Sequence, residues 1–292
     1  MDPLLLLKAA VIGVVEGITE FLPISSTAHI VITQRVLGFE DKGEVFGVVI
    51  QLGAILAVIA YFWPRVLALV KGLIAREAQA VRFATALIIA CLPAVVLGLL
   101  LNKWLEENVF GAYALAIIAA TSAIGGVIIL VVEKRTRAPI HTDATLIPYT
   151  TALGIGFLQV LAMIPGTSRS GASIIGGMCL GVSRQAATEF SFFLAIPLMF
   201  GASGLKLYKH RHDITADSLG LIAVGFVVSF VVALFVVKWL LKYVANHDFK
   251  PFGWYRIVLG VVLAALLAGG VFEMRIEPPP APDRPSHAPD RP

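Results

Sequence analysis

The sequence predicts an all-α polytopic membrane protein with six transmembrane helices and two re-entrant helical hairpins, arranged as an inverted repeat. Hydrophobic residues make up 58% of the 292 residues and charged residues only 14%, against about 25% in soluble domains. The apolar residues form runs of about 20, the length that a bilayer crossing requires. Two further apolar regions are interrupted by proline and hydroxyl clusters, and each of them begins one half of the chain.

The first interrupted region covers residues 4–37 and is broken by Pro23 and by Ser25-Ser26-Thr27. Each of its halves is short for a full crossing. Irregular backbone at membrane depth is tolerated only inside protein or beside a wet cavity. We therefore expect a re-entrant hairpin, followed by three full spans at residues 45–63, 84–101 and 111–132.

The second interrupted region covers residues 145–182 and is broken by Pro165 and by Thr167-Ser168-Arg169-Ser170. The same reasoning predicts a second re-entrant hairpin. Three more apolar runs follow it and are again long enough to cross as helices. They cover residues 187–205, 218–241 and 254–272.

The two halves form a weak repeat, because Pro165 lies 142 positions after Pro23 and the spans recur in step. Three spans is an odd number, so the second unit must enter the membrane in the opposite direction. Inverted repeats of this kind place functional sites where broken helices meet near the midplane. We expect one repeat at 1–143 and another at 144–276, with a proline-rich, disordered tail at 277–292.

Basic residues in the loops predict the orientation of the chain. Cytoplasmic loops carry an excess of Lys and Arg, and the basic loops are 64–83, 133–143 and 242–253. Placing them inside puts both termini outside, although Lys206, Lys209 and Arg211 then lie outside as well. The net charge of +4 is explained by this asymmetry, and we expect no nucleic-acid partner.

A stripe of carboxylates and glycines occupies the first hairpin. The spacing of Gly13, Glu16, Gly17 and Glu20 places them on one helix face. Carboxylates inside a membrane segment are costly unless they are paired or hydrated. Glu16 and Glu20 are therefore candidates for catalysis and for binding a metal ion. The alternative is that both face the outer interface and are merely solvated.

A hydroxyl and histidine cluster follows this stripe. Pro23 ends the first helix, and Ser25 or Ser26 is suited to cap the next one, which runs to Leu37 before Gly38. Helix N-termini attract anions. Ser26 is a candidate nucleophile, and His29, three residues later, is its candidate base. The alternative is that the serines only cap the helix and His29 makes a structural hydrogen bond.

The second hairpin carries Gly166, Thr167, Ser168, Arg169 and Ser170 at the corresponding place. Arg169 can clamp phosphate oxygens with its planar guanidinium group, unless it forms a structural pair with Glu16 or Glu20. Gln51 is either a hydrogen-bond donor to this site or a helix-packing residue. Together the groups fit phosphoryl transfer, and the carboxylates suit a hard divalent cation such as Mg²⁺.

These residues resemble a known family. The run from Glu16 to His29 resembles the first motif of the bacterial undecaprenyl-diphosphate phosphatases of the bacitracin-resistance type, and Pro165–Gly171 resembles the second. Gly181-Val182-Ser183-Arg184 extends the likeness, which covers the chain except its tail. One departure is Ala28, where the family usually has glycine.

The resemblance implies a membrane enzyme that hydrolyses undecaprenyl diphosphate to undecaprenyl phosphate and phosphate, recycling the cell-wall lipid carrier. It implies a multi-pass protein of the inner membrane with a periplasmic active site, a divalent cation (Mg²⁺, with Ca²⁺ as the alternative) and a homodimer. By matching position, the catalytic residues would be Glu16, Glu20, Ser26, His29 and Arg169. The residues expected to bind the diphosphate are Ser25, Thr27, Gly166, Thr167, Ser168 and Ser170. Gln51 is expected as an additional hydrogen-bond donor.

A rival interpretation comes from the architecture. Inverted repeats with broken helices are a transporter plan, so a lipid-phosphate transporter or flippase is the alternative function. A carrier needs charge complementarity but no nucleophile. The combination of Ser26, His29 and Arg169 therefore favours the enzyme.

Overall fold

The chain folds into helices, as a computed structural model shows for residues 2–39, 41, 45–109, 113–135, 138–209, 211 and 216–271. The first half contains α1 (Pro3–Thr19), α2 (Ser26–Leu37), α3 (Val45–Tyr61), α4 (Trp63–Ile74), α5 (Ala78–Asn108) and α6 (Ala114–Arg135). The second contains α7 (Tyr149–Val160), α8 (Arg169–Cys179), α9 (Arg184–Lys209), α10 (Ala216–Val244) and α11 (Lys250–Ala268). Short 3₁₀ turns at Ala144–Leu146 (η2) and Leu161–Met163 (η3) precede and follow α7.

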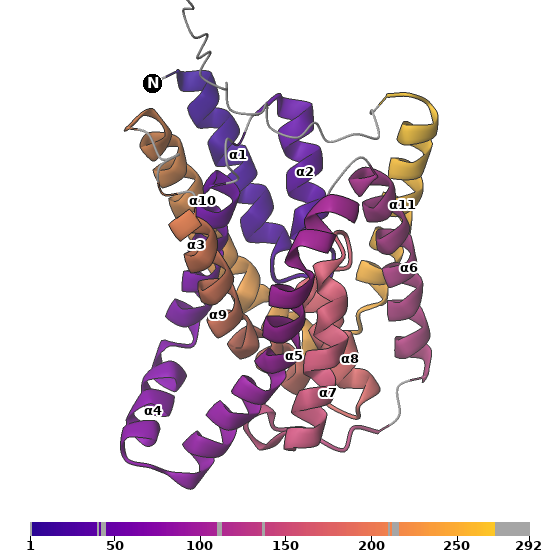
Figure 1. Ribbon diagram of the computed structural model, residues 1–292. Coiled ribbons are helices and arrows are strands. Elements are labelled where there is room, and N and C mark those ends of the chain that lie inside the picture. The colour runs from indigo at the N-terminus through magenta and orange to yellow at the C-terminus, as the bar shows by residue number, and fades with distance from the viewer. Residues whose placement is uncertain are drawn as a thin grey trace, which may run out of the picture.

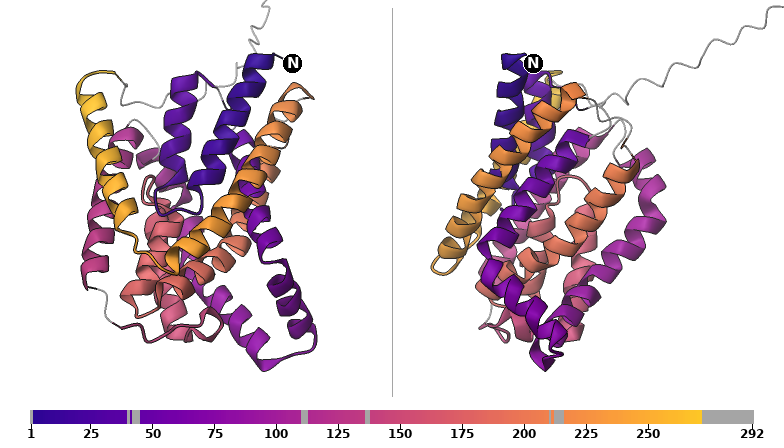
Figure 2. Two further views of the ribbon diagram at one scale, coloured as in Figure 1. Left: turned by 180° about the vertical axis from the view of Figure 1, so that it is seen from behind. Right: turned by 90° about the vertical axis from the view of Figure 1, so that its left-hand side faces the viewer.

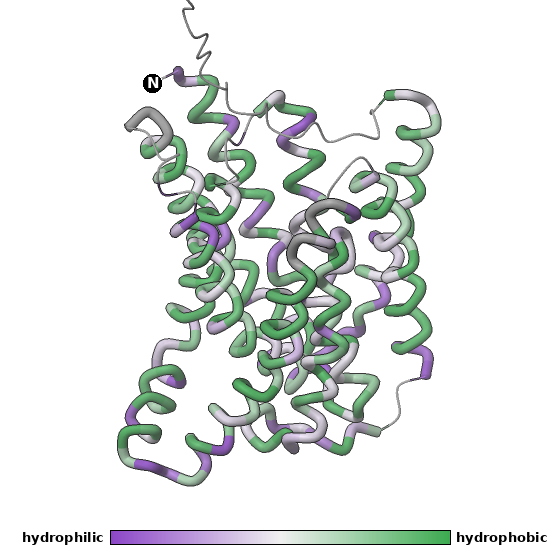
Figure 3. The backbone as a smooth tube through the Cα atoms, viewed as in Figure 1, coloured by the Kyte–Doolittle hydropathy of each residue, from purple (hydrophilic) through white to green (hydrophobic). Residues whose placement is uncertain are grey.

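The all-α membrane class predicted from the sequence is confirmed, and within the described ranges no strand forms. Five helices are long and apolar enough to cross a membrane, and α3 with α4 makes a sixth if that bent pair is one span. Within the described residues, each of the six predicted spans overlaps one helix over most of its length, namely α3, α5, α6, α9, α10 and α11. Figure 3 shows the apolar residues concentrated along these helices. The predicted tail at 277–292 lies outside the described residues.

The expected loop at 64–83 is wrong except at residues 75–77, because α4 occupies Trp63–Ile74 and α5 begins at Ala78. Pro64 stands in the first turn of this helix, where its missing N–H has no intrahelical role. Apolar residues recur at Val66, Leu69, Val70 and Leu73, the spacing of an amphipathic helix. The chain bends by 78° between α3 and α4. A second helix, rather than the expected loop, therefore follows Phe62.

Two helical hairpins approach each other from opposite ends of the molecule. Figures 1 and 2 show α1 and α2 descending from one end and turning in the middle, while α7 and α8 rise from the other end. The start of α1 and the end of α11 lie at the same end (Figure 1), and the α4–α5 connection lies at the opposite end. This arrangement agrees with the expected placing of both termini on one side.

Each hairpin packs against the other half of the chain. Gly13 and Gly17 of α1 lie against α10, where an added Cβ would be 2.6 Å from the Gly225 carbonyl oxygen and 2.8 Å from that of Ser229. Gly156 of α7 lies against the carbonyl of Ala90 in α5 in the same way. Such close backbone approach is what small residues permit between membrane helices. The tips are therefore held in the centre by helices from both halves.

Candidate active site at the two hairpin tips

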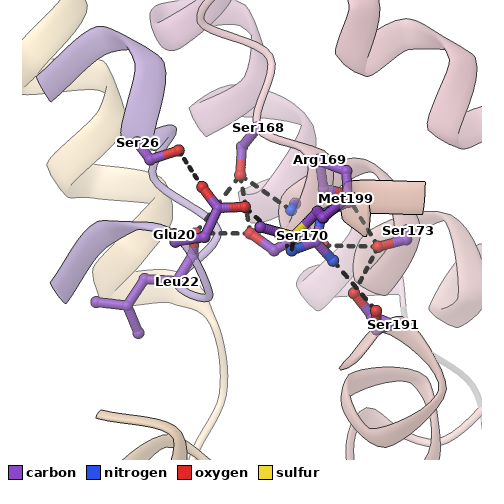
Figure 4. A network of polar contacts seen from close by, with 10 residues as sticks. Glu20, Leu22, Ser26, Ser168, Arg169, Ser170, Ser173, Ser191 and Met199 are labelled. Carbon is purple, nitrogen blue, oxygen red and sulfur yellow. Dashed lines mark hydrogen bonds and ion pairs between the residues drawn. The ribbon is translucent and has the colours of Figure 1, made fainter. Parts of the chain in front are cut away.

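The tips of the two hairpins meet through hydrogen bonds. The hydroxyl of Ser170 donates to the carbonyl oxygen of Leu22 at 2.7 Å, and that of Ser168 to the same oxygen at 3.5 Å. Ser168 and Ser170 also share a hydrogen bond at 3.0 Å. Figure 4 shows these groups converging from both hairpins. Residues 146 and 148 positions apart in the chain thus form one cluster.

The same backbone device begins the second helix of each hairpin. Ser25 has φ 73° and Ser168 has φ 74°, a conformation that non-glycine residues rarely adopt. Each serine oxygen accepts the N–H group three residues on, from Ala28 at 3.4 Å and from Gly171 at 3.1 Å. Ser25 is thus the N-cap, and Ser26 is the first helical residue. As predicted, α2 ends at Leu37 with Gly38 in the left-handed conformation.

Glu20 is the centre of the cluster (Figure 4). It is buried, accepts a short hydrogen bond from the Ser26 hydroxyl, and pairs with Nη2 of Arg169 at 3.2 Å. The expected partner of Arg169 is therefore Glu20 rather than Glu16. Arg169 also donates from Nη1 to the Ser191 carbonyl at 3.1 Å. Its side chain remains 17% exposed, so part of the guanidinium group faces outward.

Glu16 lies one helical turn before Glu20 and is also buried, at 3% exposure. The interpretation that both carboxylates are solvated at the interface is thereby excluded for this conformation. Oε1 of Glu16 has no hydrogen-bond partner within the described residues, and neither does Nε of Arg169. Buried polar groups without partners are costly. Both atoms are therefore available to a ligand, an ion or water.

Within the described residues no hydrogen bond joins His29 to Ser26, so the expected serine–histidine hydrogen bond is not formed in this structure. Nδ1 of His29 lies 2.7 Å from the Ser25 carbonyl oxygen, and Nε2 lies 2.6 Å from the hydroxyl of Tyr255. A carbonyl can only accept, so Nδ1 carries a proton, and when the ring is neutral Nε2 accepts from the Tyr255 hydroxyl. The Glu20 side chain extends across the turn at residues 21–24 to Ser26. For this reason Glu20, and not His29, accepts the hydrogen bond from the Ser26 hydroxyl.

The other predicted residues are placed less centrally. Thr27 is exposed, and Thr167 is half-buried. Gly166 adopts φ +86°, and the carbonyl groups of Gly166 and Thr167 accept hydrogen bonds from Arg256. Gln51 lies half-buried in α3, and across the described chain no hydrogen bond joins it to the hairpin tips.

Two residues of α11 contact the site and were not predicted. Tyr255 stacks on His29 with ring centroids 5.6 Å apart, and Arg256 is 1% exposed beneath the tips. The sequence did contain a sign of Arg256, because an arginine inside the apolar run 254–272 needs a buried partner. Nothing in the spacing showed that its partners are backbone carbonyls.

Metal-binding capacity rests on Glu16 and Glu20. Among the described residues no group of three or more His, Cys, Asp or Glu side chains is placed to hold an ion. Mg²⁺ is commonly bound by one or two carboxylates together with substrate phosphates and water. The unpartnered oxygen of Glu16 fits that pattern.

A separate cavity of about 960 Å³ lies between α4, α5 and the start of α9. Its lining includes Arg65, which pairs with Glu189, and the rings of Phe62, Phe83 and Phe193. None of the predicted site residues lines it. The chemistry therefore concentrates at the hairpin tips.

Comparison with known proteins shows the family of this chain. Residues 9–262 match the family model described as "Bacitracin resistance protein BacA". An undecaprenyl-diphosphatase of Acidovorax ebreus (strain TPSY) is 50% identical over 274 residues, covering 93% of this chain and 98% of the relative. One from Variovorax paradoxus (strain S110) is 51% identical over 269 residues, covering 91% and 96%. The chain belongs to the bacitracin resistance protein BacA family.

Proposed function

We propose that this protein is an integral membrane phosphatase that hydrolyses undecaprenyl diphosphate to undecaprenyl phosphate and phosphate. Relatives that match nearly the whole chain carry the name undecaprenyl-diphosphatase. The observation that carries the proposal is the meeting of Ser26, Glu20 and Arg169 at two helix N-termini. The lipid-phosphate transporter gains no support from the names of these relatives.

Arg169 and the two helix N-termini bind the diphosphate in this proposal. The guanidinium group is planar and always charged, and it suits two phosphate oxygens at once. The N–H groups at the start of α2 and α8 add positive partial charge. If Arg169 exchanged its bond to the Glu20 carboxylate for a bond to a phosphate oxygen, Glu20 would be free to accept a proton. Binding and activation are thereby coupled through Arg169.

Ser26 is the nucleophile and Glu20 its base. As the Ser26 oxygen bonds to the terminal phosphorus, its proton passes to Glu20, and the bond from that phosphorus to the bridging oxygen breaks. Undecaprenyl phosphate leaves. Water then attacks the phosphoserine, the bond from phosphorus to the Ser26 oxygen breaks, and Glu20 returns its proton to that oxygen. Phosphate leaves with the oxygen and both protons of the water. Arg169 stabilises the charge on the equatorial oxygens in both steps.

Glu16 and Glu20 would hold a divalent cation, with Mg²⁺ favoured by the two-carboxylate donor set. When bound, such an ion neutralises phosphate charge. His29 and Tyr255 border the same turn, and in this proposal they fix the start of α2 through the Ser25 carbonyl rather than deprotonate Ser26.

We further infer that the hairpins are re-entrant and that the halves are inverted repeats, with the site open to the periplasm of the inner membrane. Support comes from the opposed directions of the hairpins in Figures 1 and 2 and from the equivalent strained caps at Ser25 and Ser168. The bilayer core has no water to hydrogen-bond the free backbone groups of such turns. The central, protein-covered position of the turns agrees with this requirement. A homodimer remains part of the proposal by resemblance to the family.

The proposal is tested by phosphate release from undecaprenyl diphosphate by the purified protein in detergent, with Mg²⁺, with Ca²⁺ and with a chelator. We expect release with Mg²⁺ and its loss on chelation. Undecaprenyl phosphate serves as the control substrate, because it lacks the phosphoanhydride bond. Absence of release under every metal condition, by protein that still moves a prenyl phosphate across vesicles, would replace the enzyme by the transporter.

A further inference from the structure

Arg256 of α11 is buried and saturated with backbone partners. Its side chain has five N–H donors, and five carbonyl oxygens accept from it. Nε donates to Ser122 at 3.4 Å. Nη1 donates to Pro23 at 3.2 Å and to Thr167 at 2.8 Å, and Nη2 donates to Thr121 at 3.0 Å and to Gly166 at 2.8 Å. One planar group therefore binds three segments of the chain.

Those segments are the two hairpin tips and α6. Pro23 belongs to the first tip, and Gly166 and Thr167 belong to the second. The carbonyl of each residue shares a rigid peptide plane with the next N–H group. Holding these three carbonyl groups therefore also fixes the N–H groups of Ile24, Thr167 and Ser168. The Thr167 plane leads directly into the strained cap Ser168, and the Pro23 plane ends one residue before the strained cap Ser25.

No carboxylate in the described part of the chain pairs with Arg256, although its side chain is 1% exposed. A buried charge without a counterion is costly. The carbonyl dipoles offset part of that cost, and carbonyl groups at a buried turn would otherwise lack donors. Arg256 and the hairpin tips therefore stabilise each other only when the carbonyl groups of both tips face the guanidinium group at the same time.

The neighbouring backbone leaves space for this guanidinium group. A Cβ added at Gly125 of α6 would lie 2.7 Å from Cζ of Arg256 and 3.1 Å from its Nε. A Cβ added at Gly171 would lie 3.3 Å from its Nη1. The guanidinium group thus leaves no room for a side chain at position 125. A Gly125→Ala substitution would therefore displace the Arg256 side chain without removing its charge.

We propose that Arg256 is a positioning residue that registers the two hairpin tips so that Ser26 and Glu20 of one hairpin meet Arg169 of the other. The inference rests on the proposed phosphatase function for its kinetic consequence. Arg256 itself makes none of the contacts of Ser26, Glu20 or Arg169, so it acts through the backbone. A lysine keeps the charge but cannot reach five carbonyl groups with a fixed fork.

The test compares Arg256→Lys, Arg256→Ala and Gly125→Ala, with Gly201→Ala as the matched control. Nothing lies within 4 Å of a Cβ at Gly201. Small misplacements of catalytic groups cost about 100-fold in rate. We expect kcat for phosphate release to fall by about that factor in Arg256→Lys and Gly125→Ala, with KM changed less than about threefold. Methylguanidinium, but not methylammonium, should restore part of the rate of Arg256→Ala.

A readout independent of turnover separates this inference from the proposed function. In Arg256→Lys, amide hydrogen exchange should speed up at the tips, residues 20–29 and 164–171, while α3 and α10 stay as protected as in the unaltered protein. Unchanged exchange at the tips, or an Arg256→Lys kcat equal to that of Gly201→Ala, would overturn the positioning role. Faster exchange in a chain whose unaltered form releases no phosphate would instead overturn the phosphatase.

Discussion

Glu20 receives both the Ser26 hydroxyl and the Arg169 guanidinium group, and this sharing defines the site at the scale of residues. The residue types were predictable from the sequence, because carboxylates, hydroxyls and an arginine at membrane depth need one another. A pair of Arg169 with Glu16 or Glu20 was predicted, but not that Glu20 is the partner and that it also accepts from Ser26. This sharing depends on the turn from Phe21 to Ile24, which brings Ser26 back onto Glu20 and turns His29 toward Tyr255.

Ser26→Ala tests the nucleophile. We expect phosphate release to fall by at least three orders of magnitude, because removal of an activated nucleophile typically costs more than that of one stabilising donor. Thr85→Ala is the matched loss of a hydroxyl, since Thr85 only bonds the Val81 carbonyl in its own helix. Trapping of radioactive phosphate on the unaltered protein but not on Ser26→Ala would locate the covalent intermediate. A Ser26→Ala rate within tenfold of the parent would remove Ser26 from the chemistry.

At the scale of elements, apolar length predicted α3 and the five longer apolar helices, and proline with hydroxyl clusters predicted the two breaks. The bent α4 was missed because Lys71 and Arg65 within it resemble loop charges. Arg and Lys side chains can lay their carbon stems along an apolar surface while the charged end stays in water. Only the three-dimensional packing shows that α4 keeps an apolar face in spite of these charges. The contact of α11 with both tips was missed for a similar reason, because spacing along the chain contains no information on which helix lies beneath a turn.

The packing of α1 on α10 leads to a stability prediction. In Gly17→Ala the added Cβ would lie 2.8 Å from the Ser229 carbonyl oxygen, so α1 must shift. Overpacking of this kind costs about 1–3 kcal/mol, and the melting temperature in detergent should fall. Gly201→Ala, with open space around its Cβ, should melt at or above the parent temperature. Equal melting of both variants would show that α1 does not pack on α10 this closely.

At the scale of the whole molecule, each hairpin leans on a long helix of the other half, α1 on α10 and α7 on α5. At the far end, the buried carboxylate of Glu133 in α6 pairs with half-buried Arg184 and accepts from the Phe249 backbone N–H at 2.8 Å. The prediction of a repeat came from the sequence, through Pro23 and Pro165. The reciprocal packing could not be predicted, because glycine positions alone do not name their partner helix.

Orientation in the membrane is testable with single cysteines in a chain lacking Cys91 and Cys179. The basic α4–α5 connection is expected inside, and the α5–α6 connection outside. A membrane-impermeant maleimide added to intact spheroplasts should label Tyr113→Cys and should reach Arg76→Cys only after the membrane is opened. Both positions are solvent-accessible in the fold. The opposite labelling pattern would invert the topology and place the tips' open side on the cytoplasmic face.

The central claim is that residues from both hairpin tips act on one phosphate, and a double-mutant cycle of Glu20→Gln and Arg169→Ala measures it most directly. Removing Arg169 should cost at least about two orders of magnitude in phosphate release from undecaprenyl diphosphate. Groups that act as a unit are non-additive, so the double variant should be within about threefold of the slower single variant. Losses that multiply, as independent sites require, would contradict a single active site built from both hairpins.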